Sequence, residues 1–446
     1  MMRVRDLLQI DNQSLAGKIV KGSLGSFVLS LISTLLSFLL SIMLARVLGA
    51  NEYGVYAYAI SWMTLLSVFA RLGLDTLIPR HVASAVARED WGYIKGIFHF
   101  GIVGTGLAAS ICLVGLWFVG FTLQTASDIR FDSLWLAFIL LGVTGLMAPL
   151  SGVQRGLQQV IWAQIPSLLV LPLSFLSLVA AAYYYFQDGL SAESILRLQI
   201  LATIITLGVA VAIFVWYVPR EIRIAKSIYE ATAWANSLLP LVVTGSAYVL
   251  NMNADILLLG ALVGTESAGI YKAATRGADL VILGISMINM PLAPIIASLY
   301  AKGEMERLQR GVTKTARVGF LLSLPVAICM FFFGHLFLRL FGEEFQTGVV
   351  ALSILSIGQI INAATGPVGW LLTMTGNEKK AALGISIGVI FNIVFCLFLI
   401  PAYGLVGAAC ATSISTVIWN LMLVYYVRGC LGIDSTIIGM ATTVRA

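Results

Sequence analysis

The sequence predicts an all-α integral membrane protein, with twelve transmembrane helices in two pseudo-symmetric six-helix bundles around a central cavity. Three observations predict this class: an apolar composition, a series of long apolar runs and an internal repeat. Of the 446 residues, 59% are hydrophobic and 11% are charged, and the mean hydropathy is +0.96. Soluble chains carry roughly 25% charged residues. This composition therefore excludes a soluble enzyme and, despite the net charge of +6, a nucleic-acid partner.

Twelve runs are long enough to cross a bilayer, because about 20 apolar residues span a hydrocarbon core roughly 30 Å thick. Helices are favoured over strands, since the runs are continuously apolar and do not alternate with period two. The eighth run is long and the ninth is short, which predicts tilt or kinking there. The runs are Ser23–Leu44, Val55–Ile78, Gly96–Val119, Leu134–Val153, Val160–Tyr184, Ile195–Tyr217, Leu238–Val263, Gly269–Leu299, Gly319–Leu336, Val349–Thr373, Ala381–Ile400 and Leu405–Val427.

The basic residues lie mostly on one side of this arrangement. With an even number of spans both termini share a side, and 20 of the 27 Lys and Arg residues fall there or in loops facing it. Cytoplasmic loops carry the excess of Lys and Arg. We therefore expect a multi-pass protein of the cell (inner) membrane with both termini in the cytoplasm.

An internal repeat divides the chain into two halves. Residues 48–56 read LGANEYGVY and residues 263–271 read VGTESAGIY, so that a shift of 215 residues superposes Gly49 on Gly264, Gly54 on Gly269 and Tyr56 on Tyr271. The predicted organisation is one bundle over residues 1–218, a linker over 219–234, a second bundle over 235–430 and a tail over 431–446. Because each half has an even number of spans, both halves enter the membrane from the same side and are related by an axis along the membrane normal. This arrangement of two repeats is typical of transporters.

Several segments closely resemble a known family. These are LARVLGANEYGVYAYA (residues 44–59), LGLDTLIPRHVA (72–83), DILLLGALVGTESAGIYKAA (255–274) and LVYYVRGCLGI (423–433). They resemble the Wzx-type polysaccharide and O-antigen flippases of the multidrug/oligosaccharidyl-lipid/polysaccharide exporter superfamily, whose fold is that of multidrug and toxin extrusion (MATE) transporters. The family's turn residues correspond to Gly49, Glu52, Tyr53 and Gly54. The resemblance implies alternating-access transfer of a polyprenyl-pyrophosphate-linked oligosaccharide from the cytoplasmic to the outer leaflet.

Charged residues inside the runs are the candidate substrate site. Lys272 and Arg276 are four residues apart and share one helix face, and Arg276 lies about 12 Å below the outer surface at 1.5 Å per residue. Asp279 shares that neighbourhood, and Asp255 in the seventh run lies at a matching depth. Arg and Lys replace lost hydration around phosphate. Arg276 is therefore expected either to bind substrate or to pair with Asp255 or Asp279. Asp255 is expected either to pair with Arg276 or to bind a coupling ion.

Three further charges have alternative roles. Arg46 either lines the cavity and binds substrate or extends its side chain to the outer head groups, and Lys272 has the same alternatives. Arg71 and Asp75 are four apart near the cytoplasmic end and read as an ion pair or a gate. The five cysteines form no CxxC pair and the three histidines no HExxH motif, so no catalytic residue, metal site or cofactor is predicted.

The leading hypothesis is a flippase without covalent chemistry, acting on a lipid-linked oligosaccharide among membrane lipids, with a polysaccharide polymerase and export machinery as possible partners. A cation-coupled multidrug exporter of the same superfamily is the first alternative. That function calls for an acidic cavity, whereas the deep charges include as much Arg and Lys as Asp. A membrane glycosyltransferase or ligase is the second alternative, and it needs acidic residues on a substantial polar loop, while the outer loops here are short.

The charge bias gives a direct topology test. Reporter fusions at Asp128 and Glu343 should report the outer side of the membrane, and fusions at Lys226 and Lys379 the cytoplasmic side, because the intervening runs place these loops on opposite faces. Reversal at two or more of the four sites would contradict the twelve-span topology.

Overall fold

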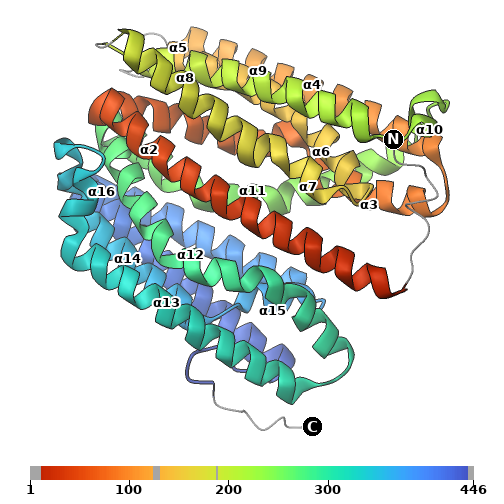
Figure 1. Cartoon of the computed structure of the whole chain (residues 1–446). Coiled ribbons are helices and arrows are strands. Elements are labelled where there is room, and N and C mark those ends of the chain that lie inside the picture. The colour runs from red at the N-terminus through yellow and green to blue at the C-terminus, as the bar shows by residue number, and fades with distance from the viewer. Residues whose placement is uncertain (1–11, 124–130, 187–188, 440–446) are drawn as a thin grey trace. The chain divides into compact units, whose positions relative to one another are not determined.

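All regular secondary structure in the described part of the chain is helical. The computed structural model describes residues 12–123, 131–186 and 189–439, and every regular element within them is a helix (Figure 1). Each of the twelve predicted runs is largely helical over its described residues, with interruptions at residues 72–73 in the second run, at Leu146 in the fourth and at residues 366–367 in the tenth. The reporter site at Asp128 lies outside the described residues.

The helices of the first part of the chain follow one another with short connections. They are α2 (Asn12–Arg71), α3 (Leu74–Ala87), α4 (Trp91–Leu123), α5 (Phe131–Gly145), α6 (Met147–Gly156), α7 (Val160–Ile165), the π-helix η1 (Pro166–Val170), α8 (Leu171–Phe186), α9 (Ala192–Tyr217) and α10 (Arg220–Ile224). The helices of the remaining chain are α11 (Ala231–Leu262), α12 (Thr265–Ala301), α13 (Met305–Arg339), the 3₁₀-helix η2 (Glu343–Gly348), α14 (Val349–Thr365), α15 (Val368–Met374) and α16 (Glu378–Leu431).

Several predicted boundaries differ from the observed ones. The first two runs share the 60-residue α2, interrupted only by non-helical backbone at Gly49, and the last two share the 54-residue α16, interrupted at Gly404. Among the described residues, eight helical stretches have sufficient length and hydropathy to cross a membrane, and Val249–Leu262 is a shorter apolar helix. The ninth run is not short, because it belongs to the 35-residue α13, which begins with an amphipathic extension before Gly319.

The chain forms two compact units. Unit 1 comprises residues 1–48 and 59–249, and unit 2 comprises residues 49–58 and 250–446. The division of the chain into six-helix halves stays a prediction, and these units differ from it at two places. Residues 49–58 of the first half belong to unit 2, and the chain passes from one unit to the other inside α11, after the predicted linker.

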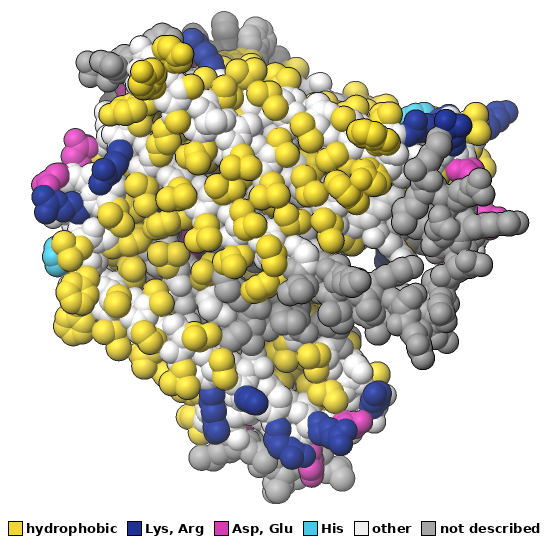
Figure 2. All heavy atoms as spheres, in the orientation of Figure 1, with side chains coloured by type: hydrophobic (Ala, Val, Ile, Leu, Met, Phe, Trp, Pro, Cys, Tyr) yellow, Lys and Arg dark blue, Asp and Glu magenta, His cyan; other side chains and the backbone are white. Residues whose placement is uncertain are grey.

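Each unit has its own apolar core. In unit 1 the cluster includes Leu74 and Ile78 of α3, Ile94 of α4 and Trp234 of α11. In unit 2 it joins α12, α13, α15 and α16 and extends beyond the last helix to Ile433, which is 2% exposed. Large hydrophobic side chains that are exposed occur along the outer faces of the helices, for example on α4, α13 and α16. Figure 2 shows such side chains over the visible helix faces, with Lys and Arg towards the helix ends. This pattern suits lipid contact.

The two copies of the repeated motif contact each other within unit 2. Residues 49–58 of α2 cross α12, and a Cβ atom built on Gly54 would lie 1.8 Å from the Thr265 carbonyl oxygen. A Cβ atom on Gly269 would lie 2.7 Å from the Gly54 nitrogen. Asn51 and Thr265 meet across the same crossing at 3.3 Å. The glycines that the repeat superposes are therefore the residues that let the two helix backbones approach.

This crossing predicts a strong effect of adding one methyl group. Gly54→Ala should lower the melting temperature of the purified protein by several degrees, because the methyl group has no room against backbone atoms and overpacking costs about 1–3 kcal/mol. Gly208→Ala in α9 is the matched control, since a Cβ atom there meets nothing within 4 Å. Equal melting temperatures for the two variants would contradict the close crossing.

Candidate functional site

Arg276 and Asp279 form an ion pair on α12 in unit 2. The guanidinium Nη1 lies 3.9 Å from Asp279 Oδ2, and the two side chains are 35% and 58% exposed. The Arg276 Nε is buried and has no hydrogen-bond partner in the described structure. Lys272, one turn earlier on the same face, is half-buried. The predicted grouping of these three charges is thus confirmed, and Arg276 keeps donor capacity that Asp279 does not use.

Asp255 lies at the centre of a second, deeply buried polar cluster. The residue is 4% exposed. Its Oδ2 accepts a hydrogen bond from the Tyr271 hydroxyl at 2.7 Å and one from the Thr412 hydroxyl at 3.3 Å, and its Oδ1 accepts from the Ile256 backbone N–H at 2.9 Å. Tyr271 and Thr412 are 3.0 Å apart. The cluster therefore joins α11, α12 and α16.

The predicted pairing of Arg276 with Asp255 is wrong, because Arg276 pairs with Asp279 and Asp255 is held by two hydroxyl groups. Tyr271 marks the face of α12 that meets Asp255. Arg276 follows it by five residues, which places the arginine about 140° further around the helix. The predicted pairing rested on matching depth in the membrane, and depth alone does not say which face of a helix a residue occupies.

The Asp255 cluster offers a chemistry distinct from that of Arg276. A carboxylate and two hydroxyl oxygens are hard oxygen donors of the kind that alkali and alkaline-earth cations prefer. An isolated buried carboxylate is otherwise costly unless it is protonated or hydrogen-bonded. Sequence reasoning singled out Asp255 but missed its partners. Tyr271 was visible as the tyrosine that the repeat superposes on Tyr56, whereas Thr412 lies in a stretch rich in small residues that reads as a packing face.

The predicted ion pair of Arg71 with Asp75 is confirmed, and it has a third member in unit 1. Arg71 Nη1 lies 3.6 Å from one Asp75 oxygen, and Arg155 Nη2 lies 3.5 Å from the other. Arg155 also donates to the Ser151 hydroxyl at 3.0 Å. All three charged side chains are between 36% and 39% exposed. One carboxylate thus faces two guanidinium groups, which leaves a net positive charge.

Close packing of α3 against α6 brings Arg155 to this pair. A Cβ atom built on Gly156 would lie 2.5 Å from the Val82 Cβ, so that only glycine allows the two helices to meet there. Arg155 directly precedes Gly156 in the sequence, and this glycine is the local signal that indicates the contact. Arg46 is exposed and lies one turn before the break at Gly49.

Comparison with known families identifies the chain. A model described as "Polysaccharide biosynthesis protein" matches residues 19–300, which is more than half of the sequence. The protein belongs to this family. A second model, that of the MatE family, matches residues 240–398. The family assignment agrees with the resemblance carried by residues 44–59.

Some relatives match along most of their length. The chain is 23% identical to a putative O-antigen transporter of Shigella flexneri over 92% of this chain and 98% of that protein. It is 20% identical to a probable low-salt glycan biosynthesis flippase of Haloferax volcanii over 92% of this chain and 83% of that protein. The chain is thus similar over nearly its whole length to membrane proteins of glycan export.

Solved structures show the same fold at low sequence identity. An inward-facing multidrug resistance MATE family transporter has a TM-score of 0.72 at 14% identity, covering 91% of this chain and 94% of that one. The lipid II flippase MurJ in an inward closed conformation has a TM-score of 0.71 at 14% identity, covering 92% and 87%. The MATE-like all-α fold predicted from the sequence is confirmed.

The separate environments of Asp255 and Arg276 give a test by double mutation. Asp255→Asn should leave the melting temperature within a few degrees, because the amide oxygen still accepts the Tyr271 hydrogen bond. Combining it with Arg276→Gln should change stability by about the sum of the two single effects, because the two side chains share no hydrogen-bond or ion-pair partner among the described residues and such residues usually behave additively. Recovery of stability in the double variant, measured by thermal unfolding in detergent, would show instead that the two charges pair.

Proposed function

We propose that this protein is a flippase that transfers a polyprenyl-pyrophosphate-linked oligosaccharide from the cytoplasmic to the outer leaflet during synthesis of a surface polysaccharide. The observation that carries the proposal is the family match over residues 19–300, with flippase and O-antigen transporter relatives aligned along most of their length. Arg276, half-buried inside a membrane helix, gives the proposal a chemical basis.

The physical task is to move a polar, anionic head group through an apolar layer while its lipid tail stays in the bilayer. An arginine at membrane depth is costly, so it faces a partner, water or a substrate. The planar guanidinium of Arg276 binds phosphate in bidentate geometry. Its pair with Asp279 is long at 3.9 Å, so that a phosphate oxygen competes well for its donors. Lys272 adds a second positive charge one turn away.

The cluster in which Arg71 and Arg155 both contact Asp75 supports a role for these residues as an ion-pair gate. Its two contacts of 3.6 and 3.5 Å are longer than the 2.7–2.9 Å of strong charge-assisted hydrogen bonds. Such a pair opens at modest cost when a helix moves. On this proposal Arg46 lines the path of the substrate. The proposal also places both termini in the cytoplasm. A polymerase and export machinery receive the flipped unit.

A cation-coupled multidrug exporter is the second candidate function, and the buried Asp255 cluster is the observation that favours it. Its three oxygen ligands suit a proton or a small cation, and the MatE model matches residues 240–398. Coupling to an ion gradient is equally compatible with a flippase. An exporter would differ from a flippase in the molecule that it transports. The charges of Lys272, Arg276 and Asp279 suit an anionic head group better than a cationic drug.

Substrate binding by Arg276 is tested by reconstitution. Arg276→Ala should reduce flipping of a fluorescent polyprenyl-pyrophosphate oligosaccharide in proteoliposomes by about tenfold or more, because it removes charge-assisted hydrogen bonds to phosphate. Lys272→Ala should weaken flipping less, by roughly two- to threefold, because the ammonium makes a single point contact. Normal surface polysaccharide in cells that carry only the Arg276→Ala protein would remove this arginine from the site.

Arg339→Ala is the matched control, because Arg339 is 63% exposed and pairs with Glu343 at the end of α13. It should flip at the wild-type rate. The same proteoliposomes, loaded with a fluorescent cationic drug, test the exporter reading. Drug transport that responds to a sodium or proton gradient and disappears in Asp255→Asn, without flipping of the lipid-linked sugar, would replace the flippase proposal.

A further inference from the structure

The chain does not stop at the end of α16 but folds back into unit 2. Residues 432–439, here called the C-terminal strap, begin at Gly432, whose left-handed backbone (φ 64°) ends the helix. The next three residues are buried, with Ile433 at 2%, Asp434 at 3% and Ser435 at 0% exposure. Ile433 belongs to the apolar core of the unit. Segments outside regular elements ordinarily run over the protein surface, so the burial of this one calls for a reason.

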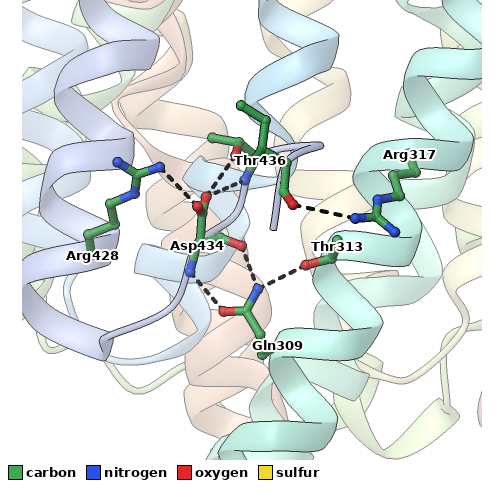
Figure 3. Close-up of polar contacts among 7 residues, drawn as sticks. Gln309, Thr313, Arg317, Arg428, Asp434 and Thr436 are labelled. Atoms are coloured by element: carbon green, nitrogen blue, oxygen red, sulfur yellow. Dashed lines mark hydrogen bonds and ion pairs between the residues drawn. The ribbon is translucent and has the colours of Figure 1, made fainter. Parts of the chain in front are cut away.

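The strap is hydrogen-bonded to α13 and α16, as Figure 3 shows, and also to the end of α14. On α13, the Gln309 amide binds the Asp434 backbone at both ends: Oε1 accepts from the N–H at 2.8 Å, and Nε2 donates to the carbonyl at 2.6 Å. Arg317, two turns further along α13, donates to the Ile437 carbonyl at 2.9 Å. On α16, Arg428 pairs with the Asp434 carboxylate at 2.9 Å.

The third attachment is at a break in the tenth span. α14 ends at Thr365 and α15 begins at Val368. A helix end leaves carbonyl groups without partners, and the Ala364 carbonyl is satisfied by the Ile437 N–H of the strap at 3.0 Å. Between the helices, Gly366 has φ +77°, and a Cβ atom there would lie 2.2 Å from the Ser435 carbonyl oxygen. The strap therefore lies directly on the backbone of the break.

The Asp434 carboxylate is ionised in this arrangement. Burial raises its pKa, but the hydrogen bonds from the Thr436 backbone and hydroxyl and from Arg428 outweigh burial, and the pKa lies below its ordinary value. A carboxylate with a lowered pKa stabilises the folded state above its ordinary pKa, and this contribution is lost only as the pH falls through the lowered value. The ion pair thus holds the strap in place at neutral pH.

Unit 1 contains a corresponding attachment. The segment after α9 docks on α4: Lys95 donates to the Arg223 and Ala225 carbonyls at 2.7 and 3.0 Å, and the Ile228 N–H donates to the Gly92 carbonyl at 3.0 Å. α9 and α16 end 214 residues apart, at Tyr217 and Leu431. In both halves, therefore, the chain that follows the sixth span returns to the third one.

We propose that the C-terminal strap is a rigid brace: it closes the break between α14 and α15 and makes α13, α14, α15 and α16 move as one body during transport. Without it, Gly366 and Pro367 form a hinge in the tenth span, because helix breaks are where chains absorb conformational change. Burial of three consecutive residues and hydrogen bonds to three helices favour permanent docking over release, since mobile elements are those with few buried contacts. This inference goes beyond the proposed function and does not depend on the cargo.

Hydrogen exchange on the full-length protein tests the brace. Gln309→Ala removes both side-chain bonds to the Asp434 backbone, and it should speed amide exchange in residues 366–375 by about tenfold. Arg310→Ala on the same helix is the control, because its side chain is 76% exposed and pairs only loosely with Glu306. It should leave exchange in this segment unchanged. Unchanged exchange in Gln309→Ala would overturn the proposal.

A disulfide distinguishes a permanent brace from a latch that must open. A Cβ atom on Gly439 would lie 3.0 Å from the Thr313 Cβ, close enough for a disulfide after a small shift. The pair Thr313→Cys with Gly439→Cys, in a Cys430→Ser background, should oxidise readily and flip at the same rate oxidised and reduced. Slower flipping after oxidation that a reductant restores would show a releasing latch, and failure to oxidise would contradict the docked position. Either result overturns the brace.

Discussion

The lack of water inside a lipid bilayer is the constraint on which the rest of this structure depends. Every backbone N–H and C=O group in the hydrocarbon region needs a partner within the protein, and continuous helices supply that partner for most of the chain. The places where the helices are interrupted are therefore the informative ones. At Gly49 the Glu344 carboxylate accepts from the Ala50 N–H at 2.8 Å, and at Gly366 the C-terminal strap binds the Ala364 carbonyl. Both of these interruptions are compensated by a segment distant in sequence.

The same constraint explains why the residues shared by the two copies of the internal repeat include glycines at the helix crossing. Helices in lipid gain nothing from burying apolar side chains, so close backbone contact and hydrogen bonds hold them together. Gly54 and Gly269 provide such contact, and the repeat superposes them because each copy of the motif packs against the other copy. The charges do not follow this symmetry: Arg276 corresponds to Ser61 and Asp255 to Leu40. The glycine framework sets the fold, while the charges are placed independently of it.

Much of the fold could be predicted from the sequence, because spans depend on composition and length alone. The helical class, the positions of the runs and the Arg71–Asp75 pair at four-residue spacing all follow from local pattern. The continuity of α2 and α16 could not be predicted, because a glycine in a polar stretch reads equally as a loop or a kink. The partner of Asp255 was missed for a different reason: it depends on the rotation of α12 about its axis, and that rotation is set by packing at Gly269, which local sequence does not encode.

On the proposed function, the two polar sites on α11 and α12 would divide the requirements of transport between them. Asp255 is almost fully enclosed by Tyr271 and Thr412, so it responds to something small, a proton or a bare cation, and to any rotation of α12 against α16. Arg276 is one-third exposed and its only ion-pair partner among the described residues is 3.9 Å away, so it can meet a large anionic group. Both sites use the same helix, with Tyr271 and Arg276 five residues apart. A change in the protonation or ligation of Asp255 would act on Tyr271 and hence on the orientation of Arg276, which provides a direct mechanical route from an ion to a head group.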